Sequence, residues 1–97
     1  MAHYILLANY TEQGVKGIKD TVKRTEAVKE LAKKAGLAMK ESYWTLGAYD
    51  VVALFEAPDD ETMTAFSLSV AKLGNVRTQT LRAFTPKDMG GILAKMV

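Results

Sequence analysis

Two patterns of apolar and polar residues occur in turn along the chain, one typical of strands and the other of helices. Strands are predicted where short stretches are rich in β-branched and aromatic residues, over 3–10, 37–46, 51–57 and 76–84. Helices are predicted where apolar residues recur at helical spacing, over 18–35 and from an acidic start at 58–61 to Leu73. A tail with some helical character follows over 85–97.

The segments between these elements are polar and contain glycine. Residues 11–17 include two glycines and are predicted to form a loop. Gly36 follows the first helix and predicts its end, because glycine readily takes the conformation that terminates helices. Gly47 begins a turn over 47–50 and is expected to supply a backbone conformation that other residues avoid.

The order of these elements, βαββαβ, predicts an α+β fold of the ferredoxin-like type. In such a fold two helices cover one face of a four-stranded antiparallel sheet. In this arrangement the strands at 3–10 and 51–57 are central and the other two are edges. The residues agree, because the first two are apolar on both faces and the other two are more polar. A length of 97 residues corresponds to one domain, so we predict a single domain over 1–97.

Central strands that are apolar on both faces require a cover for each face. Two helices form only one layer, and a half-solvated antiparallel sheet would instead alternate apolar and polar residues. A bare apolar face is rare in soluble monomers. The simplest cover is the same face of a second copy across a two-fold axis. The sequence therefore predicts a homo-oligomer that is at least a dimer through the sheet face.

The composition excludes several classes of site. The chain has no cysteine, which removes disulfides, thiolate catalysis, zinc ribbons and iron–sulfur clusters. Its single histidine, His3, lacks a second histidine or a cysteine with which to hold a metal, so neither metal nor cofactor is expected. No apolar run approaches the roughly 18 residues of a membrane span, and no signal-peptide pattern is present. We therefore expect a cytoplasmic protein without membrane contact.

The charge pattern does not favour a nucleic-acid partner. The net charge is only +2. Basic residues cluster within 16–34, but Asp20, Glu26 and Glu30 are interleaved with them at spacings that pair opposite charges on a helix. A solvated, salt-bridged helix face is therefore favoured over a phosphate-binding surface.

Arg24 is the most informative single residue, because it falls inside the apolar arc of the first predicted helix. That arc consists of Ile18, Val22, Val28, Leu31, Ala32 and Ala35. A guanidinium there needs an acceptor, or must extend along the edge of the arc to solvent. One interpretation is an ion pair with Asp50, or with Glu41, that holds the hairpin against the helix. The other is an anion-binding group at the mouth of a cavity between helix and sheet.

Tyr43 and Trp44 are neighbours in the second strand and therefore point to opposite faces. One is expected to face the helices and the other a partner subunit, since packing is the usual role of strand aromatics. No serine is surrounded by a nucleophile-elbow pattern, and the glycines of 14–17 do not match a phosphate-binding loop. No motif is catalytic by itself, and catalytic residues stay unassigned.

A family resemblance rests on the turn after the second strand and on matches elsewhere. The run Tyr43-Trp44-Thr45-Leu46-Gly47-Ala48-Tyr49-Asp50 resembles the signature of the GYD-domain family, named for its Gly, Tyr and Asp at this turn. Further similarities lie at 10–14, at Arg24, at 57–60 and at 74–84, so the resemblance covers nearly the whole chain. It implies membership of the dimeric α/β-barrel superfamily, in agreement with the predicted dimer.

The same resemblance implies little about activity, because the family is one of uncharacterised function. The wider superfamily includes cofactor-free monooxygenases, lactone isomerases, haem enzymes and amino-acid-sensing regulatory modules. Fold does not choose among them.

The favoured hypothesis is a homo-oligomeric domain that binds a small molecule in a cavity between sheet and helices. Arg24 is expected to recognise charge, while Tyr43, Asp50 and Thr11 fix the orientation of the ligand. Trp44 would form an apolar wall if it is the aromatic that faces inward.

Two alternatives stay open at this point. The first is a metal-free enzyme, of the monooxygenase or isomerase kind, that acts on a small aromatic or anionic metabolite. In it Tyr43 or His3 would transfer protons and Arg24 would stabilise a developing anion. The second is a purely structural or interaction module, in which Arg24 and Asp50 form an ion pair and the cavity is filled.

Overall fold

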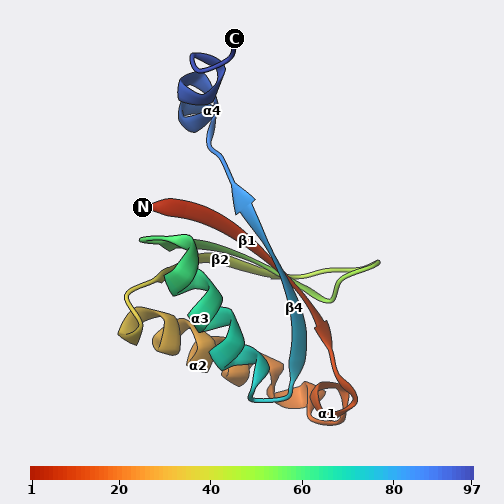
Figure 1. Cartoon of the computed structure of the whole chain (residues 1–97). Helices are drawn as coiled ribbons and strands as arrows, with labels where there is room; N and C mark the ends of the chain where they lie inside the picture. The colour runs from red at the N-terminus through yellow and green to blue at the C-terminus, as the bar shows by residue number, and fades with distance from the viewer.

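Four antiparallel strands form the centre of the fold in the computed structural model, which describes residues 1–97 (Figure 1). The strands are β1 Ala2–Tyr10, β2 Ala38–Trp44, β3 Val51–Ala57 and β4 Val76–Ala83. Their order in the sheet is β2-β3-β1-β4, so β1 and β3 are central and β2 and β4 are edges. The predicted ferredoxin-like fold is confirmed.

Two helices, α2 Thr21–Lys34 and α3 Asp60–Ala71, cover one face of this sheet (Figure 1). Asp59 caps α3 by accepting a hydrogen bond of 2.7 Å from the backbone N–H of Thr62. That backbone donor holds the pKa of the Asp59 carboxyl below its usual range. The acidic start predicted for this helix is confirmed, and Asp59 caps it.

The core lies between the helices and the face of the sheet that they cover. Alternate residues of both central strands point into it, and α3 contributes the largest helical side chains. Its members are Tyr4, Leu6, Ala8, Ala32, Leu37, Ala53, Phe55, Ala57, Met63, Phe66 and Val70. We call this covered side the inner face of the sheet and the opposite side the outer face.

The prediction of a loop over 11–17 is wrong, because these residues form the short helix α1, Glu12–Lys16. Thr11 starts this helix, since its hydroxyl oxygen accepts a 3.1 Å hydrogen bond from the backbone N–H of Gly14. A side chain at Gly14 would place its Cβ 2.0 Å from the carbonyl oxygen of Asn75. Gly14 therefore permits a close approach of two backbones rather than a flexible loop.

The apolar arc predicted over 18–35 is wrong at both ends. Val28 and Leu31 pack against the core, but Ile18, Val22 and Ala35 are exposed. The short 3₁₀ helix η1, Ile18–Asp20, precedes α2 and has three residues per turn, which changes the angular phase of the residues before the α-helix. Ala35 lies beyond the last residue of α2.

An irregularity in β2 also changes which side chains point inward. Met39 pairs with Phe55, but the next paired residue is Glu41, opposite Leu54. This bulge adds one residue to the edge strand. As a result Met39 and Ser42 both share the inner face, although they are three positions apart.

The tail contains the helix α4, Pro86–Leu93, which stands away from the sheet beyond the end of β4 (Figure 1). Thr85 and Asp88 form a capping box, and Pro86 occupies the first helical turn. The apolar residues of this tail recur at helical spacing and are exposed: Met89, Ile92, Leu93 and Met96. No helix of the chain is long and apolar enough to cross a membrane.

Candidate functional site

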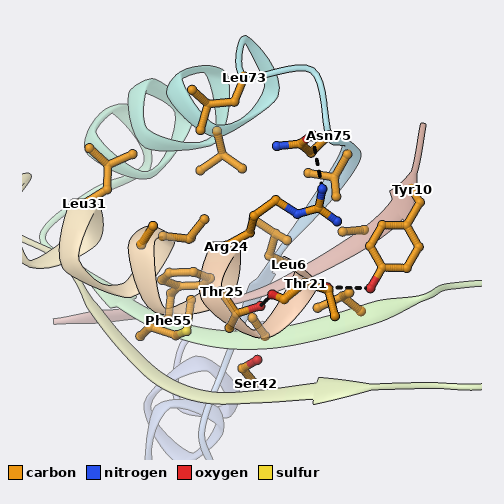
Figure 2. A pocket seen from close by; sticks show the side chains of 18 residues that line it. Leu6, Tyr10, Thr21, Arg24, Thr25, Leu31, Ser42, Phe55, Leu73 and Asn75 are labelled. Atoms are coloured by element: carbon orange, nitrogen blue, oxygen red, sulfur yellow. Dashed lines mark hydrogen bonds between the residues drawn. The ribbon is translucent and has the colours of Figure 1, made fainter. Parts of the chain in front are cut away.

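A cavity of about 160 Å³ lies between the inner face of the sheet and helix α2, with the end of α3 and the start of β4 closing it (Figure 2). Of its 18 lining residues, 13 are hydrophobic, and they include Leu6, Val28, Phe55 and Val70. Concave sites with apolar walls and a few polar groups are typical of small-molecule binding.

Arg24 extends from α2 into the polar end of this cavity (Figure 2). Its Nη2 donates a 3.1 Å hydrogen bond to the carbonyl oxygen of Gly14, and its Nη1 donates a long one of 3.5 Å to Oδ1 of Asn75. A Cβ at Gly17 would lie 3.0 Å from Nη1, so this glycine leaves room for the guanidinium. Arg24 forms no ion pair with any carboxylate, and its partners in the chain are neutral.

Helix α1 and the α3–β4 loop are joined beside Arg24. Nε2 of Gln13 donates 3.0 Å hydrogen bonds to the carbonyl oxygen of Leu73 and to Oδ1 of Asn75. The Thr11 hydroxyl donates to the carbonyl oxygen of Gly74 at 2.5 Å. This network fixes Asn75, and the Gly14 carbonyl beside it, where they accept from the guanidinium.

A second polar cluster centres on Thr21 at the start of α2. Nε1 of Trp44 donates a 3.1 Å hydrogen bond to the Thr21 hydroxyl, which also shares a hydrogen bond of 2.8 Å with the Tyr10 hydroxyl. Of these three residues, Tyr10 and Thr21 line the cavity. Their hydroxyls are already paired with each other.

The Ser42 hydroxyl, in contrast, lines the cavity, is buried and has no hydrogen-bond partner. Buried hydroxyls are nearly always paired, because leaving one unpaired costs about 1–3 kcal/mol. Ser42 and Arg24 are therefore two wall residues that have hydrogen-bonding capacity to spare.

Of the five residues predicted to contribute to a binding site, Arg24 alone lines the cavity. Thr11 is occupied as the cap of α1. Trp44 is on the inner side but is 46% exposed, while Tyr43 is on the outer face and 52% exposed. The two aromatics thus lie on opposite faces as predicted.

The ion pair considered between Arg24 and Asp50 or Glu41 does not form. Oδ2 of Asp50 instead accepts a 2.9 Å hydrogen bond from the backbone N–H of Tyr10 at the end of β1. Glu41 pairs with Leu54 and shares the outer face with it. One donor of Arg24 instead goes to the Gly14 carbonyl of α1, a helix that the sequence pattern did not reveal, and another goes to Asn75.

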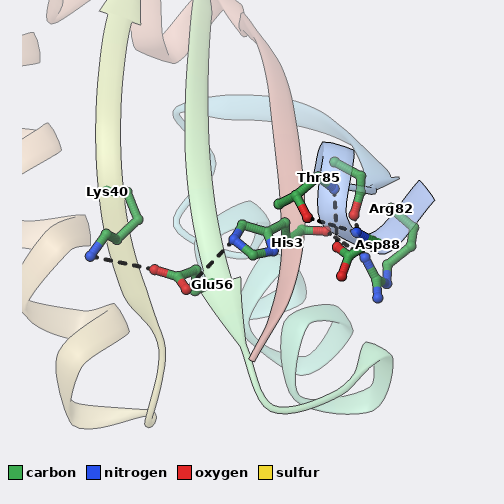
Figure 3. A network of polar contacts seen from close by, with 7 residues as sticks. His3, Lys40, Glu56, Arg82, Thr85 and Asp88 are labelled. Carbon is green, nitrogen blue, oxygen red and sulfur yellow. Dashed lines mark hydrogen bonds and ion pairs between the residues drawn. The ribbon is translucent and has the colours of Figure 1, made fainter. Parts of the chain in front are cut away.

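The outer face has an apolar centre and a polar edge. Its apolar residues come from three strands and include Ile5, Leu7, Val52, Leu54 and Leu81. Towards one end of the strands, Oε1 of Glu56 lies 3.6 Å from Nε2 of His3, and its Oε2 lies 3.4 Å from Nζ of Lys40 (Figure 3). His3 and Tyr43 are therefore on the side of the sheet opposite Arg24.

Tyr4 links the inner face to the start of α3. Its hydroxyl donates a 2.5 Å hydrogen bond to Oδ1 of Asp60, and the guanidinium of Arg82 lies 5.4 Å from the centre of its ring. Burial, and then the hydrogen bond to Asp60, raise the pKa of Tyr4 to about 12. Tyr4 thus stays protonated over the whole physiological range.

Helix α2 has exposed lysines and no ion pair within 4.0 Å. The salt bridges predicted among its charged residues are absent, because exposed long side chains gain little from fixed pairing. The solvated face itself is present. No group of three side chains of the kind that ligates metals is found in the chain.

Sequence reasoning missed Ser42, Asn75 and Thr21 as wall residues. The alternation of β2 places Ser42 on the same face as Trp44, a signal that could have marked it. Asn75 lies between the predicted helix, which ends at Leu73, and the predicted strand over 76–84, and no role in the site was predicted for it. Its role depends on α1, whose position no periodicity indicates.

Comparison with known proteins identifies the family. The family model described as GYD domain matches residues 4–93. A relative from Thermus thermophilus, named glutamine synthetase and cystathionine beta-lyase binding protein, is 32% identical over 90 residues, which are 92% of this chain and 95% of that protein.

Solved structures show the same fold. The crystal structure of TTHA0845 from Thermus thermophilus has 26% identity and a TM-score of 0.58, covering 88% of this chain and 95% of that one. The crystal structure of the hypothetical protein PHS023 from Pyrococcus horikoshii, at 21% identity, has a TM-score of 0.57 and covers 88% of this chain and 92% of that one. At such identity the second likeness concerns the fold alone.

Proposed function

The chain belongs to the GYD domain family, and from this premise we propose that it is a homo-oligomeric domain that binds a small molecule between its sheet and helix α2. The observation that carries the proposal is the guanidinium of Arg24, which reaches an apolar cavity and has no carboxylate partner. A partly buried charge without a counter-charge is costly in an apolar site, and a ligand can supply what the chain lacks.

Two alternative functions are less well supported by the geometry. A structural role for Arg24 rested on an ion pair with Asp50, whose carboxylate instead accepts from the Tyr10 backbone. An enzyme rested on Tyr43 or His3 as proton carriers, and both lie on the outer face of the sheet. Neither can act within one chain on a molecule that Arg24 holds on the inner face.

The oligomer in this proposal forms through the outer face. That face combines an apolar centre with charged groups at its edge, which is the usual pattern of protein interfaces. The exposed stripe of the tail, from Met89 to Met96, is a second apolar surface that the chain does not cover itself. A two-fold partner would bury the centre of the outer face against its own copy.

A second candidate function is the binding of metabolic enzymes. It is favoured by the relative whose name states that it binds glutamine synthetase and cystathionine beta-lyase, and which this chain matches over 95% of its length. The test is co-elution of the purified chain with each of these two enzymes from its own host in size-exclusion chromatography. Separate elution of all components would remove this candidate.

The cavity itself is tested by nuclear magnetic resonance with benzene as a neutral probe. An engineered apolar protein cavity of about 150 Å³ is known to bind benzene. Val28 lines the cavity from α2, whereas Val22 is exposed on the same helix. We expect saturable shifts of the backbone amides around the cavity in the wild type and in Val22→Phe, and none in Val28→Phe. Shifts that do not saturate, or that persist in Val28→Phe, would contradict a ligand cavity.

A further inference from the structure

We propose that the ligand is a compact monocarboxylate with an apolar body about the size of one six-membered ring. This inference rests on the function proposed above and names the chemical class for the same cavity. Three properties of the walls support it: the volume, the single uncompensated charge and the unpaired hydroxyl.

The volume limits the body of the ligand. An apolar cavity of about 150 Å³ accommodates benzene, and this one measures about 160 Å³. Its walls are side chains of Leu6, Val28, Phe55 and Val70, which offer no hydrogen bond. A nucleotide, a sugar phosphate or a long acyl chain exceeds this volume and would extend out of the cavity.

The charge of Arg24 selects the head group. A guanidinium has five N–H donors in one plane, and the chain uses one from each terminal nitrogen, on Gly14 and on Asn75. The remaining donors match the two oxygens of a carboxylate. A carboxylate would also neutralise a charge that no side chain of the protein neutralises.

One charge, rather than two, is indicated by the rest of the wall. Arg24 is the sole charged residue among the 18 that line the cavity. The polar residues Tyr10 and Thr21 are neutral and already paired with each other, and Thr25 donates to the Thr21 carbonyl oxygen at 3.0 Å. A phosphate dianion would meet one cation only, and a ligand cation would meet the like charge of Arg24.

Ser42 favours an occupant with polar atoms over a hydrocarbon such as benzene. Its buried hydroxyl has no partner, and a hydrocarbon would leave it unpaired. A ligand with polar atoms removes this penalty, which is about 1–3 kcal/mol for each buried unpaired group.

The experiment is calorimetric or NMR titration of the full chain with three probes: benzoate, benzamide and acetate. Benzamide has the shape of benzoate without its charge, and acetate has the charge without the ring. We expect benzoate to bind saturably and about tenfold or more tightly than either comparator, because hydrogen bonds to charged groups contribute about 1.5–3 kcal/mol. Equal affinities for benzoate and benzamide would overturn the inference.

Variants identify the residue that binds the carboxylate. Arg24→Gln is expected to reduce benzoate affinity about tenfold or more, to the level of benzamide, and to leave benzamide unchanged. Arg77→Gln removes the same charge from an exposed position on β4 and is expected to change nothing. Arg24→Lys, which keeps the charge but loses the planar fork, is expected to give an intermediate affinity and serves if Arg24→Gln does not fold. Unchanged benzoate affinity in the Arg24 variants would overturn the inference.

The outcomes separate this inference from the function on which it rests. Binding of benzamide and benzene that Val28→Phe abolishes, without any preference for benzoate, would retain the cavity and reject the carboxylate. Absence of binding by every probe would reject both.

Discussion

The two faces of the sheet are built from neighbouring residues of the same strands and have different surroundings. In β3, Phe55 is 2% exposed beneath the helices, while the adjacent Leu54 is only partly buried on the outer face. The chain has two helices over the sheet and can cover one face with them. An apolar residue on the inner face is therefore buried by its own chain, and one on the outer face depends on something outside it.

The polar groups of the two faces also differ, in whether they find partners within the chain. On the outer face His3 and Lys40 lie towards one end of the strands, and both contact Glu56. On the inner face Arg24 and Ser42 lie against an apolar cavity and have unused hydrogen-bonding capacity. The outer face suits a macromolecular surface with an apolar centre, and the inner face suits a small molecule.

The largest effect is expected from placing a charge at the centre of the outer face. Leu54→Arg brings two guanidiniums close to the two-fold axis of the proposed dimer and desolvates them. An unpaired buried charge costs about 3–5 kcal/mol, so dissociation should rise by two to three orders of magnitude or more. Sedimentation velocity measures the change.

The matched control is Val22→Arg, which adds the same charge at a side chain 58% exposed on α2. It should leave the assembly intact. A Leu54→Arg protein that stays associated as firmly as the control would contradict the proposed role of the outer face.

Alanine substitutions of the two adjacent residues compare the faces directly. Phe55→Ala should lower the free energy of unfolding by about 3–5 kcal/mol at any protein concentration, because it leaves a cavity in the core. Leu54→Ala should cost about 1 kcal/mol in the separate chain, and more at concentrations where the dimer forms. Urea unfolding at two protein concentrations tests this, and a Leu54→Ala cost that ignores concentration would count against the dimer.

The close packing of α1 against the α3–β4 loop is tested at Gly14. Gly14→Ala forces a Cβ towards the carbonyl oxygen of Asn75 and should lower the free energy of unfolding by about 1–3 kcal/mol. The control Gly90→Ala lies in α4, where nothing is within 4 Å, and should be neutral or slightly stabilising. Equal unfolding midpoints in urea for the two variants would contradict the close packing of α1.

The last prediction concerns how the free energy of unfolding depends on pH through Tyr4, which lies on the inner face. The pKa of Tyr4 is raised from 10.0 to about 12 in the folded chain, so folding favours its protonated form. Its contribution to stability is complete below pH 10 and is lost as the pH rises from 10 to about 12. Tyr4→Phe has no hydroxyl to ionise and lacks this pH-dependent contribution. The wild type should therefore lose stability more steeply than the variant between pH 10 and about 12. Parallel curves of unfolding free energy against pH would contradict the raised pKa.

Most of the fold was predictable because it depends on local signals. The strand over 51–57 has the predicted bounds, and β1 and β3 were identified as central because both of their faces are apolar. The turn glycine was also predictable, since Gly47 has a φ of 109°. The helix α1 was missed because five residues with a glycine in the middle carry too little periodicity to indicate a helix.

Of the candidate site, the sequence allowed one residue to be predicted, Arg24, but not the residues around it. Arg24 stood out because a guanidinium inside an apolar arc needs a partner. One of the two interpretations paired it with Asp50 or Glu41, since oppositely charged residues are the obvious partners. The actual acceptors are a carbonyl and an amide from segments far apart in sequence. Met39 and Ser42 share the cavity through a bulge, which shifts strand alternation and leaves no mark in composition.

Native mass spectrometry of the full chain with benzoate tests most directly the claim that the two faces bind two different partners. We predict the mass of two chains with up to two benzoate molecules for the wild type. For Leu54→Arg we predict one chain that still binds one benzoate, since the cavity lies within a single chain. A wild-type protein that is monomeric at micromolar concentration and binds no benzoate would contradict the account.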